Sequence, residues 1–153
     1  MNSVPPQAAA HSGSTLALLL REIRAAFWTR MEAELHAAGH ELTFSQYITL
    51  KELAKGEASA TDLAHAAQLN PGAMTRLLDK LEQRGILARV ADPKDRRALR
   101  IHLTDAGAAI WNDVNHCGQR VRERATRGMS EADCDALTRL LTQVRDNLSS
   151  RES

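Results

Sequence analysis

The sequence predicts a mainly α-helical fold with one small β-hairpin, arranged as a winged helix-turn-helix flanked by long N- and C-terminal helices. Three observations carry this prediction. Apolar residues recur at steps of three and four along most of the chain, behind polar capping residues. Two short capped segments follow one another before residue 85. Alternating apolar residues then flank a charged turn at residues 92–97.

The chain is expected to begin with a flexible arm and a long helix. Residues 1–13 contain two prolines, several small residues and no apolar period, which is typical of a mobile terminus. From Ser14 onwards, apolar residues between Leu16 and Leu35 recur at helical spacing. We expect this amphipathic helix to end near Gly39, because glycine commonly terminates helices.

Two shorter helices are predicted next. Residues 43–46 (TFSQ) have the form of a capping box and start a helix that stops near Gly56. Residues 59–62 (SATD) mark another start, with an acidic residue in the positively polarised first turn. This second short helix is expected to end near Leu69.

The following helix begins at Asn70 and Pro71, which place a capping side chain before a proline at the first helical position. Gly85 is expected to end it. Its buried stripe is predicted to comprise Met74, Leu77, Leu78 and Leu81.

A β-hairpin is predicted after this helix. Residues 86–90 form the first strand, and residues 92–95 (DPKD) place Asp and Pro where a type I turn favours them. On the return strand, apolar residues alternate with polar ones, so one face is expected to be buried and the other solvated. The alternating residues are Leu99, Arg100, Ile101, His102 and Leu103.

Two long helices are predicted to close the chain. Thr104 caps the first of them, and residues 130–133 (SEAD) cap the second. Together with the first helix they carry more apolar surface than one small winged helix can cover, so we expect a homodimer formed by the terminal helices. Their stripes comprise Ile110, Val114, Cys117 and Val121, then Leu137, Leu141, Val144 and Leu148.

These elements predict a division of the chain into an arm at 1–13, a winged helix-turn-helix region at 43–103, and a dimerisation region. The dimerisation region comprises two segments, 14–42 and 104–153. The length of 153 residues allows for one domain together with such an oligomerisation part.

The distribution of charge points to a nucleic acid more clearly than the net charge of +1 does. Residues 76–102 contain eight basic and four acidic side chains, whereas residues 1–75 and 103–153 are each slightly acidic. The positive charge is therefore concentrated on the proposed helix and hairpin, as attraction to phosphates requires. Considered without the other features, this concentration of basic residues can also be explained by an ordinary solvent-exposed face.

The helix that begins at Pro71 shows short or polar residues opposite its apolar stripe, as a helix entering the major groove must. Gly72 permits a close backbone approach, and Arg76 can bind either a guanine edge or a phosphate. Lys80 lies later on the helix and is expected to meet a phosphate.

The tip of the hairpin carries three cations. Arginine at such a tip suits the narrow, electronegative minor groove of A·T-rich DNA. Asp95 is expected to hold a neighbouring arginine by a charge-assisted hydrogen bond. The complete set of candidate DNA contacts is Ser59, Thr61, Pro71, Gly72, Thr75, Arg76, Lys80, Lys94, Asp95, Arg96 and Arg97.

Residues 69–87 (LNPGAMTRLLDKLEQRGIL) and 92–107 (DPKDRRALRIHLTDAG) resemble the MarR family of bacterial transcriptional regulators. The resemblance extends over roughly residues 14–148. It implies a homodimer, a palindromic operator in double-stranded DNA and, in most members, repression that a small ligand relieves. Carried over, residues 71–76 form the reading end of the recognition helix, Arg97 is the wing arginine, and Arg96 is a second candidate.

Relatives of this kind commonly bind small aromatic acids or phenols between the dimerisation helices and the winged helix. Four of the five aromatic residues lie between residues 27 and 47 and can wall such a crevice. We expect Phe27 and Phe44 to pack at the junction of the first two helices instead. The candidate ligand-binding residues are Arg21, Arg24, Trp28 and Tyr47.

Sensing by oxidation or by metals is a weaker hypothesis. Cys117 falls on an apolar stripe and is expected to be an inert core thiol, whereas Cys134 follows a helix start, where the dipole can lower its pKa. His36 and His40 are four residues apart, but a glycine separates them and no further ligand pattern completes a metal site. We therefore expect neither a metal nor any other cofactor.

Other classes of protein fit less well. The sequence contains no glycine-rich phosphate loop, nucleophile elbow or His-Glu-x-x-His motif, so an enzyme is not expected. It contains no signal-like segment, no membrane-length apolar run and only two cysteines, which favours the cytoplasm. A winged helix that docks onto another protein remains an alternative, because the fold does not dictate function.

Overall fold

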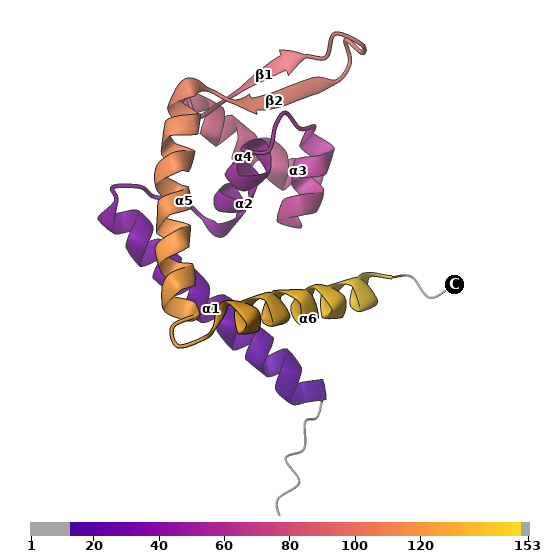
Figure 1. Ribbon diagram of the computed structural model, residues 1–153. Helices are drawn as coiled ribbons and strands as arrows, with labels where there is room; N and C mark the ends of the chain where they lie inside the picture. Colours follow the sequence, from indigo (N-terminus) through magenta and orange to yellow (C-terminus); the bar gives the residue numbers. More distant parts are fainter. Residues whose placement is uncertain (1–12, 151–153) are drawn as a thin grey trace, which may run out of the picture.

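The computed structural model describes residues 13–150 of the chain. Within this range six helices and one two-stranded hairpin follow one another, as Figure 1 shows, which confirms the predicted mainly α fold with a hairpin wing. Most of the predicted arm lies outside the described residues; Gly13 begins the first helix. The elements are α1 (Gly13–Ala37), α2 (Phe44–Leu53), α3 (Ala60–Ala67), α4 (Pro71–Gln83), β1 (Leu87–Ala91), β2 (Leu99–Leu103), α5 (Asp105–Ala125) and α6 (Glu131–Ser149).

Polar side chains start the helices α2 to α6 where the sequence predicts. In each case the side-chain oxygen of the N-cap accepts a hydrogen bond from the backbone N–H three residues later, at 2.8–3.2 Å. Each bond satisfies one of the N–H groups that a helix start leaves without a partner. The five N-caps are Thr43, Ser59, Asn70, Thr104 and Ser130.

The helix-turn-helix consists of α3, a short turn and α4. Gln68 ends α3 in the left-handed conformation, with φ of 53°. Asn70 then caps α4, and Pro71 occupies its first position. Only three residues separate the two helices, so this short turn restricts the angle between α3 and α4.

The hairpin pairs β1 and β2 in antiparallel register, from Leu87 with Leu103 to Ala91 with Leu99. Ile101 is buried, but Leu99 is 49% exposed, so the predicted burial of one whole face of the return strand is wrong at the tip. The reason is that Leu99 lies beside the turn, beyond the helices that cover Ile101. Ala58 adds an unpredicted bridge to Ile101 through two backbone hydrogen bonds of 3.0 and 2.9 Å.

The junction between the wing and α5 is closely packed. The Thr104 hydroxyl lies 2.5 Å from the carbonyl oxygen of Gly85, and its backbone N–H donates to the carbonyl of Ile86 at 3.1 Å. Gly107 is buried against that same Ile86 carbonyl, which leaves no room for a side chain. The start of α5 is therefore tied to the residues that connect α4 with β1.

The core lies where α1 and α5 meet the winged helix, which includes α2. Met31 and Leu35 of α1, Leu50 of α2 and Val114 of α5 are each at most 1% exposed. The predicted stripe of α4 is buried as well, and so are Val114, Cys117 and Val121 of α5. Burial of these side chains attaches the winged helix to α1 and α5 as one body.

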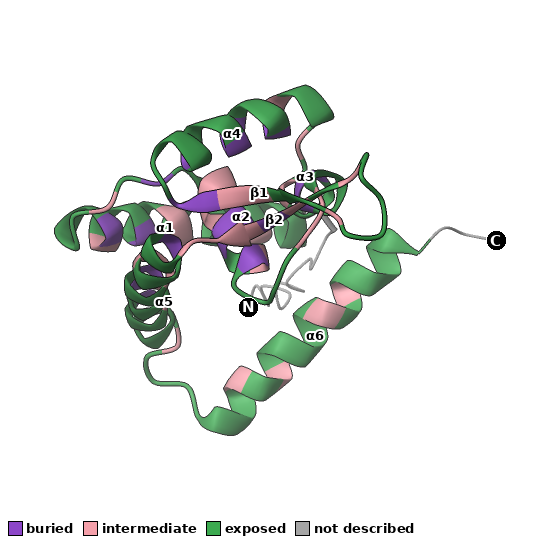
Figure 2. Ribbon diagram, turned by 90° about the horizontal axis from the view of Figure 1, so that it is seen from above, coloured by how far each residue is buried: buried purple, intermediate pink, exposed green. Residues whose placement is uncertain are grey.

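The outer helices are covered over only part of their apolar stripes. In Figure 2, α6 is exposed or intermediate along its whole length, and it contains no buried residue. On α1 the apolar residues nearer the N-terminus are also open. The large exposed apolar side chains of the two helices are Leu16, Leu18, Leu19 and Ile23 of α1 and Leu137, Leu140, Leu141 and Leu148 of α6.

Within the described residues, no helix combines the length and the apolar character that crossing a membrane requires.

Candidate nucleic-acid interface

The N-terminal turns of α4 form the first part of the candidate interface. Pro71, Gly72, Thr75 and Arg76 are all exposed, opposite the buried stripe of the helix. The Thr75 hydroxyl donates to the Pro71 carbonyl at 2.9 Å, so its oxygen remains able to accept a hydrogen bond. This end of the helix offers a flat polar surface with one cation.

Gly72 and Arg76 lie one helical turn apart on this surface. A Cβ placed on Gly72 would be 3.8 Å from Nη1 of Arg76 and 3.6 Å from Oδ1 of Asn70. The Arg76 guanidinium therefore extends back over the first turn of the helix, as helical side chains commonly do. Among the described residues no carboxylate lies within ion-pair distance of it.

The tip of the wing is a compact turn held by two aspartates. Asp92 accepts a hydrogen bond from the backbone N–H of Lys94 at 2.8 Å, and Asp95 accepts one from the backbone N–H of Arg97 at 3.0 Å. Asp95 thus orients the backbone of Arg97, rather than its guanidinium as the sequence analysis expected. The two carboxylates shape the turn by Asx-type hydrogen bonds.

The cations of the wing tip remain available to an anion. Lys94, Arg96 and Arg97 are exposed, and within the described part of the chain none of them has a carboxylate within ion-pair distance. Both Figure 1 and Figure 2 place this tip and the α3–α4 turn on the side of the molecule away from α5. The wing tip and the start of α4 are therefore exposed on the same side.

An ion-pair cluster that the sequence analysis missed connects the wing to α4. Nη2 of Arg89 in β1 lies 2.6 Å from Oδ1 of Asp79, and its Nε lies 3.1 Å from Oε2 of Glu82. Nε is buried and does not point well enough at Glu82 to form a hydrogen bond, so the Asp79 contact is the stronger. The sequence contained a signal for this cluster, because Arg89 lies opposite the buried Ile101 in the hairpin. A charged side chain at such a position needs a partner of opposite charge.

Ser59 and Lys80 differ from the other candidate DNA contacts in their surroundings. Ser59 is the half-buried N-cap of α3, whose hydroxyl accepts from the Asp62 N–H, whereas Thr61 is exposed on the first turn of that helix. Lys80 is exposed but lines a cavity between α4 and the end of α1. Of the eleven candidate DNA contacts, all except Ser59 are thus exposed.

The candidate ligand residues also come together. Arg21, Arg24 and Trp28 line a hollow of about 400 Å³, which Phe44 of α2 closes on one side. The Arg24 guanidinium carbon lies 5.4 Å from the centre of the Phe44 ring, a cation–π contact. Phe44 packs edge-on against Trp28 at 5.2 Å, so it both joins the two helices, as expected, and lines the hollow.

Tyr47 lies behind this hollow rather than on its surface. Its ring is 5.9 Å from that of Trp28 and 6.0 Å from that of Trp111 on α5. Burial raises the pKa of the Tyr47 hydroxyl above its ordinary value, so the phenol is neutral and able to donate at neutral pH. The aromatic cluster thus connects the hollow on α1 with α5.

Cys117 is buried in the core, as the sequence predicts, whereas Cys134 is not. Cys117 is 1% exposed, and burial raises the pKa of its thiol, an effect that the nearby Arg120 charge opposes. Cys134 lies on the first turn of α6 and is partly exposed. Among the described residues, no three His, Cys, Asp or Glu side chains are close enough to share a metal ion.

Comparison with known proteins agrees with this architecture. The model of the MarR family matches residues 42–99. A crystal structure of mutant MarR from E. coli in complex with operator DNA has 24% sequence identity and a TM-score of 0.73, covering 85% of this chain and 93% of that one. A MarR family protein from Bacillus stearothermophilus has 25% identity and a TM-score of 0.74, covering 90% and 95%.

A third solved structure is that of Bordetella bronchiseptica BpsR, described as regulated in its DNA binding by 6-hydroxynicotinic acid. It has 24% identity and a TM-score of 0.73, covering 85% of this chain and 92% of that one. The family model matches the winged helix, and the shared fold extends beyond it to the flanking helices. The chain is therefore similar to the MarR family in its winged helix, and to solved structures of that family in its fold.

Proposed function

We propose that this protein is a homodimeric, sequence-specific DNA-binding regulator, and that it acts as a repressor which a small aromatic acid or phenol releases. The observation that carries the proposal is the pair of exposed cationic features on one side of the winged helix. Arg76 of α4 and the wing-tip residues Lys94, Arg96 and Arg97 have no carboxylate partner among the described residues. By contrast, Arg89 between them is neutralised by acidic residues.

This pattern separates cations that position the elements from cations available to DNA. In the proposed complex, residues 71–76 enter the major groove, where Gly72 permits close approach and Arg76 contacts a base edge or a phosphate. Arg97 at the wing tip enters the neighbouring minor groove. Thr75, with its free acceptor, and Thr61 and Ser59 on α3 are proposed to contact the backbone beside it.

Dimerisation is proposed through segments 14–42 and 104–153, with residues 43–103 left to bind DNA. The support is the exposed apolar surface of α1 and α6, which a monomeric soluble protein rarely maintains over such lengths. Leu19 is 50% exposed on α1, and Leu140 is 50% exposed on α6. Pairing with a second copy would bury both and would present two α4 helices to a palindromic operator.

Dimerisation is tested by analytical ultracentrifugation of wild type and of Leu140→Glu. We expect wild type to sediment as a dimer and the variant to dissociate at much higher protein concentration, because the new carboxylate would be desolvated in the interface. Lys51→Glu, an exposed change on α2, is the control. A monomeric wild type at micromolar concentration would refute the dimer.

The effector is proposed to bind in the hollow lined by Arg21, Arg24 and Trp28. A guanidinium beside aromatic rings suits an aromatic carboxylate. The guanidinium pairs with the carboxylate, and the aromatic side chains stack on the ring of the ligand. Tyr47 supports Trp28 from behind. The regulation of the Bordetella relative by 6-hydroxynicotinic acid supports this class of ligand. Sensing through Cys134 or through a metal remains the alternative.

DNA binding is tested by fluorescence anisotropy with a duplex from the region upstream of the protein's own gene, at several salt concentrations. We expect Arg76→Ala to lose about 1–3 kcal/mol of discrimination between that duplex and a scrambled one. Arg97→Ala should weaken binding to both duplexes and lower the salt slope by about one. Arg127→Ala, an exposed position just after the C-terminal end of α5, removes the same charge as a control.

The result also decides between DNA binding and a protein-docking winged helix. Absence of binding, or binding that does not respond to salt, would support docking onto a protein. Wild-type affinity in the Arg76→Ala, Arg97→Ala double variant would contradict the proposed interface.

A further inference from the structure

A carboxylate lies in the middle of the exposed face of α4, and the proposed DNA contacts do not include it. Asp79 follows Gly72 by seven residues and Arg76 by three, so the helical period places all three on one face, opposite the buried stripe. The Asp79 side chain is 50% exposed. A surface offered to phosphates therefore carries a negative charge near its centre.

Arg89 of β1 holds this carboxylate by one of its two oxygens. Nη2 of Arg89 donates to Oδ1 of Asp79 at 2.6 Å, and no other cation in the described part of the chain lies within ion-pair distance of Asp79. Among the described residues, no group donates to Oδ2. The guanidinium thus offsets the charge that would repel phosphates, and it leaves one oxygen able to accept a hydrogen bond.

Arg89 is itself held in place, so it can fix the position of Asp79. It lies opposite the buried Ile101 in the hairpin, and its side chain is only 23% exposed. Its Nε lies 3.1 Å from Oε2 of Glu82, one turn further along α4. The Asp79 carboxylate therefore loses part of its rotamer freedom before DNA arrives, which lowers the entropic cost of a further contact.

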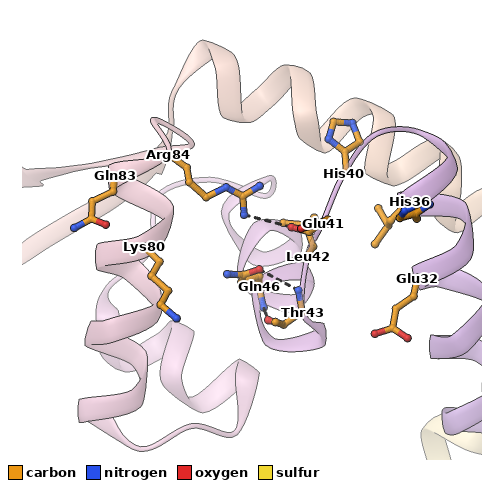
Figure 3. A pocket seen from close by; sticks show the side chains of 11 residues that line it. Glu32, His36, His40, Glu41, Leu42, Thr43, Gln46, Lys80, Gln83 and Arg84 are labelled. Carbon is orange, nitrogen blue, oxygen red and sulfur yellow. Dashed lines mark hydrogen bonds between the residues drawn. The ribbon is translucent and has the colours of Figure 1, made fainter.

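The cations on the other flank of α4 do not take part in this arrangement. Lys80 and Arg84 line a cavity of about 650 Å³ between α4 and the end of α1, with Glu32 on the opposite wall, as Figure 3 shows. Arg84 donates to the Glu41 carbonyl at 3.3 Å. Asp79 does not line this cavity, so it is held from the side of the wing.

We propose that Asp79 accepts a hydrogen bond from the N4 amino group of a cytosine in the major groove, and that it determines specificity at that base pair. Cytosine presents a donor alone, whereas adenine places the N7 acceptor beside its amino group. Guanine and thymine present acceptors, which a carboxylate repels. The inference rests on the proposed function and adds the base that the third turn of α4 selects.

Helix geometry also indicates where this cytosine lies. Asp79 is three residues beyond Arg76. This separation corresponds to about 4.5 Å along the helix axis, and successive base pairs are about 3.4 Å apart. We therefore expect the cytosine one or two base pairs from the base nearest to Arg76.

The first test is selection of binding sites from a pool of random duplexes by the full chain, followed by sequencing of the bound fraction. We expect wild type to enrich a cytosine at one position of each half-site. Asp79→Asn keeps an oxygen for Arg89 and adds an amide donor, so it should select adenine there instead. Asp79→Ala should lose a preference of about tenfold at that position alone. Each comparison is between duplexes bound by one variant, so a smaller folded fraction does not alter it.

Glu82→Gln is the matched control. It removes a carboxylate that faces the same guanidinium, but Glu82 is six residues beyond Arg76 and lies about 120° from it around the helix. We expect this variant to select the same bases as wild type. An unchanged preference in Asp79→Asn, or the same change in Glu82→Gln, would show that Asp79 only supports Arg89 and would overturn the inference.

A modified base tests the contact at the level of one hydrogen. N4-methylcytosine carries a methyl group in place of the amino hydrogen that faces the groove in an intact base pair. In fluorescence anisotropy, this base at the selected position should weaken wild type about tenfold and leave Asp79→Ala unaffected. Equal losses for the two proteins would contradict the contact.

The selection also separates this inference from the proposed function. A motif that wild type enriches and that Asp79→Asn leaves unchanged overturns the inference and leaves sequence-specific DNA binding intact. A pool from which wild type enriches no sequence overturns both.

Discussion

Gly107 offers a stringent test of how the wing is joined to α5. A Cβ added to this residue would overlap the Ile86 carbonyl oxygen and come within 2.9 Å of its carbonyl carbon. Both belong to backbone, which cannot rotate away as a side chain can. The same carbonyl accepts the backbone N–H of Thr104 at 3.1 Å, so separating the two segments also strains that bond.

The expected cost of Gly107→Ala can be worked from these contacts. Overpacking of this kind costs about 3 kcal/mol, at the upper end of the usual range because the obstacle is backbone. Alanine recovers about 1 kcal/mol through its higher helix propensity. We therefore expect the free energy of unfolding to fall by about 2 kcal/mol.

Gly118 provides a matched control in the same helix. A Cβ there would lie 3.9 Å from the Tyr47 hydroxyl oxygen and 4.0 Å from Cε of Met31, which are ordinary contacts. Gly118→Ala should accordingly gain up to about 1 kcal/mol. The two variants make the same chemical change, so their difference isolates the contact with Ile86.

The assay is urea unfolding followed by far-UV circular dichroism, at one fixed protein concentration because dimerisation would contribute to stability. The midpoint for Gly107→Ala should fall while the slope stays constant. If Gly107→Ala were as stable as wild type, or as stable as Gly118→Ala, the close junction between the wing and α5 would be refuted.

Three further predictions follow from other contacts. A double-mutant cycle of Arg89→Ala and Asp79→Ala should give a coupling energy of about 1 kcal/mol in urea unfolding, and a value of zero would show that the pair does not hold β1 to α4. With Ellman's reagent, Cys134 should react quickly and Cys117 only after unfolding, since burial protects the latter and raises its pKa; two equally fast thiols would contradict this. Asp133 accepts hydrogen bonds from the N-cap of α6, which lower its pKa, so this contribution to stability is present above the ordinary aspartate pKa and is lost as pH falls through the lowered value. An NMR titration in which Asp133 shows an ordinary or raised pKa would contradict it.

The local elements were predictable because their signals are local. Ser59 and Asn70 begin helices through hydrogen bonds to residues only three positions away, which a sequence pattern records directly. The same holds for the buried stripe of α4, whose spacing matches the helical period. The segment 92–107, on which the family resemblance partly rests, ends in a close contact, since Thr104 and Gly107 both lie against the Ile86 backbone.

Contacts between distant segments were predictable only in part. Arg89 was counted in the sequence among the basic residues of a DNA-binding surface, yet in the structure it pairs with Asp79 ten residues earlier. Lys80 was assigned to a phosphate, and the structure places it on a cavity shared with α1. In both cases the direction of a long side chain depends on elements that no helical or strand period encodes.

The aromatic hollow could be predicted in part. Clustering of aromatic residues near Trp28 indicated the region, because neighbouring helices bring nearby segments together. Which of them line the hollow depends on packing: Phe44 lies on its surface, whereas Tyr47 turns toward Trp111 of α5.

The sequence by itself determined the order of the elements, their caps, the buried stripe of α4 and the cationic wing tip, because short-range hydrogen bonds and apolar periods specify these features. Tertiary structure alone decided which cations are free. Packing of β1 against α4 neutralises Arg89, and the approach of α1 to α4 brings Lys80 and Arg84 to face Glu32. The physical reason is that charge pairing depends on distances of a few ångströms between segments far apart in the chain.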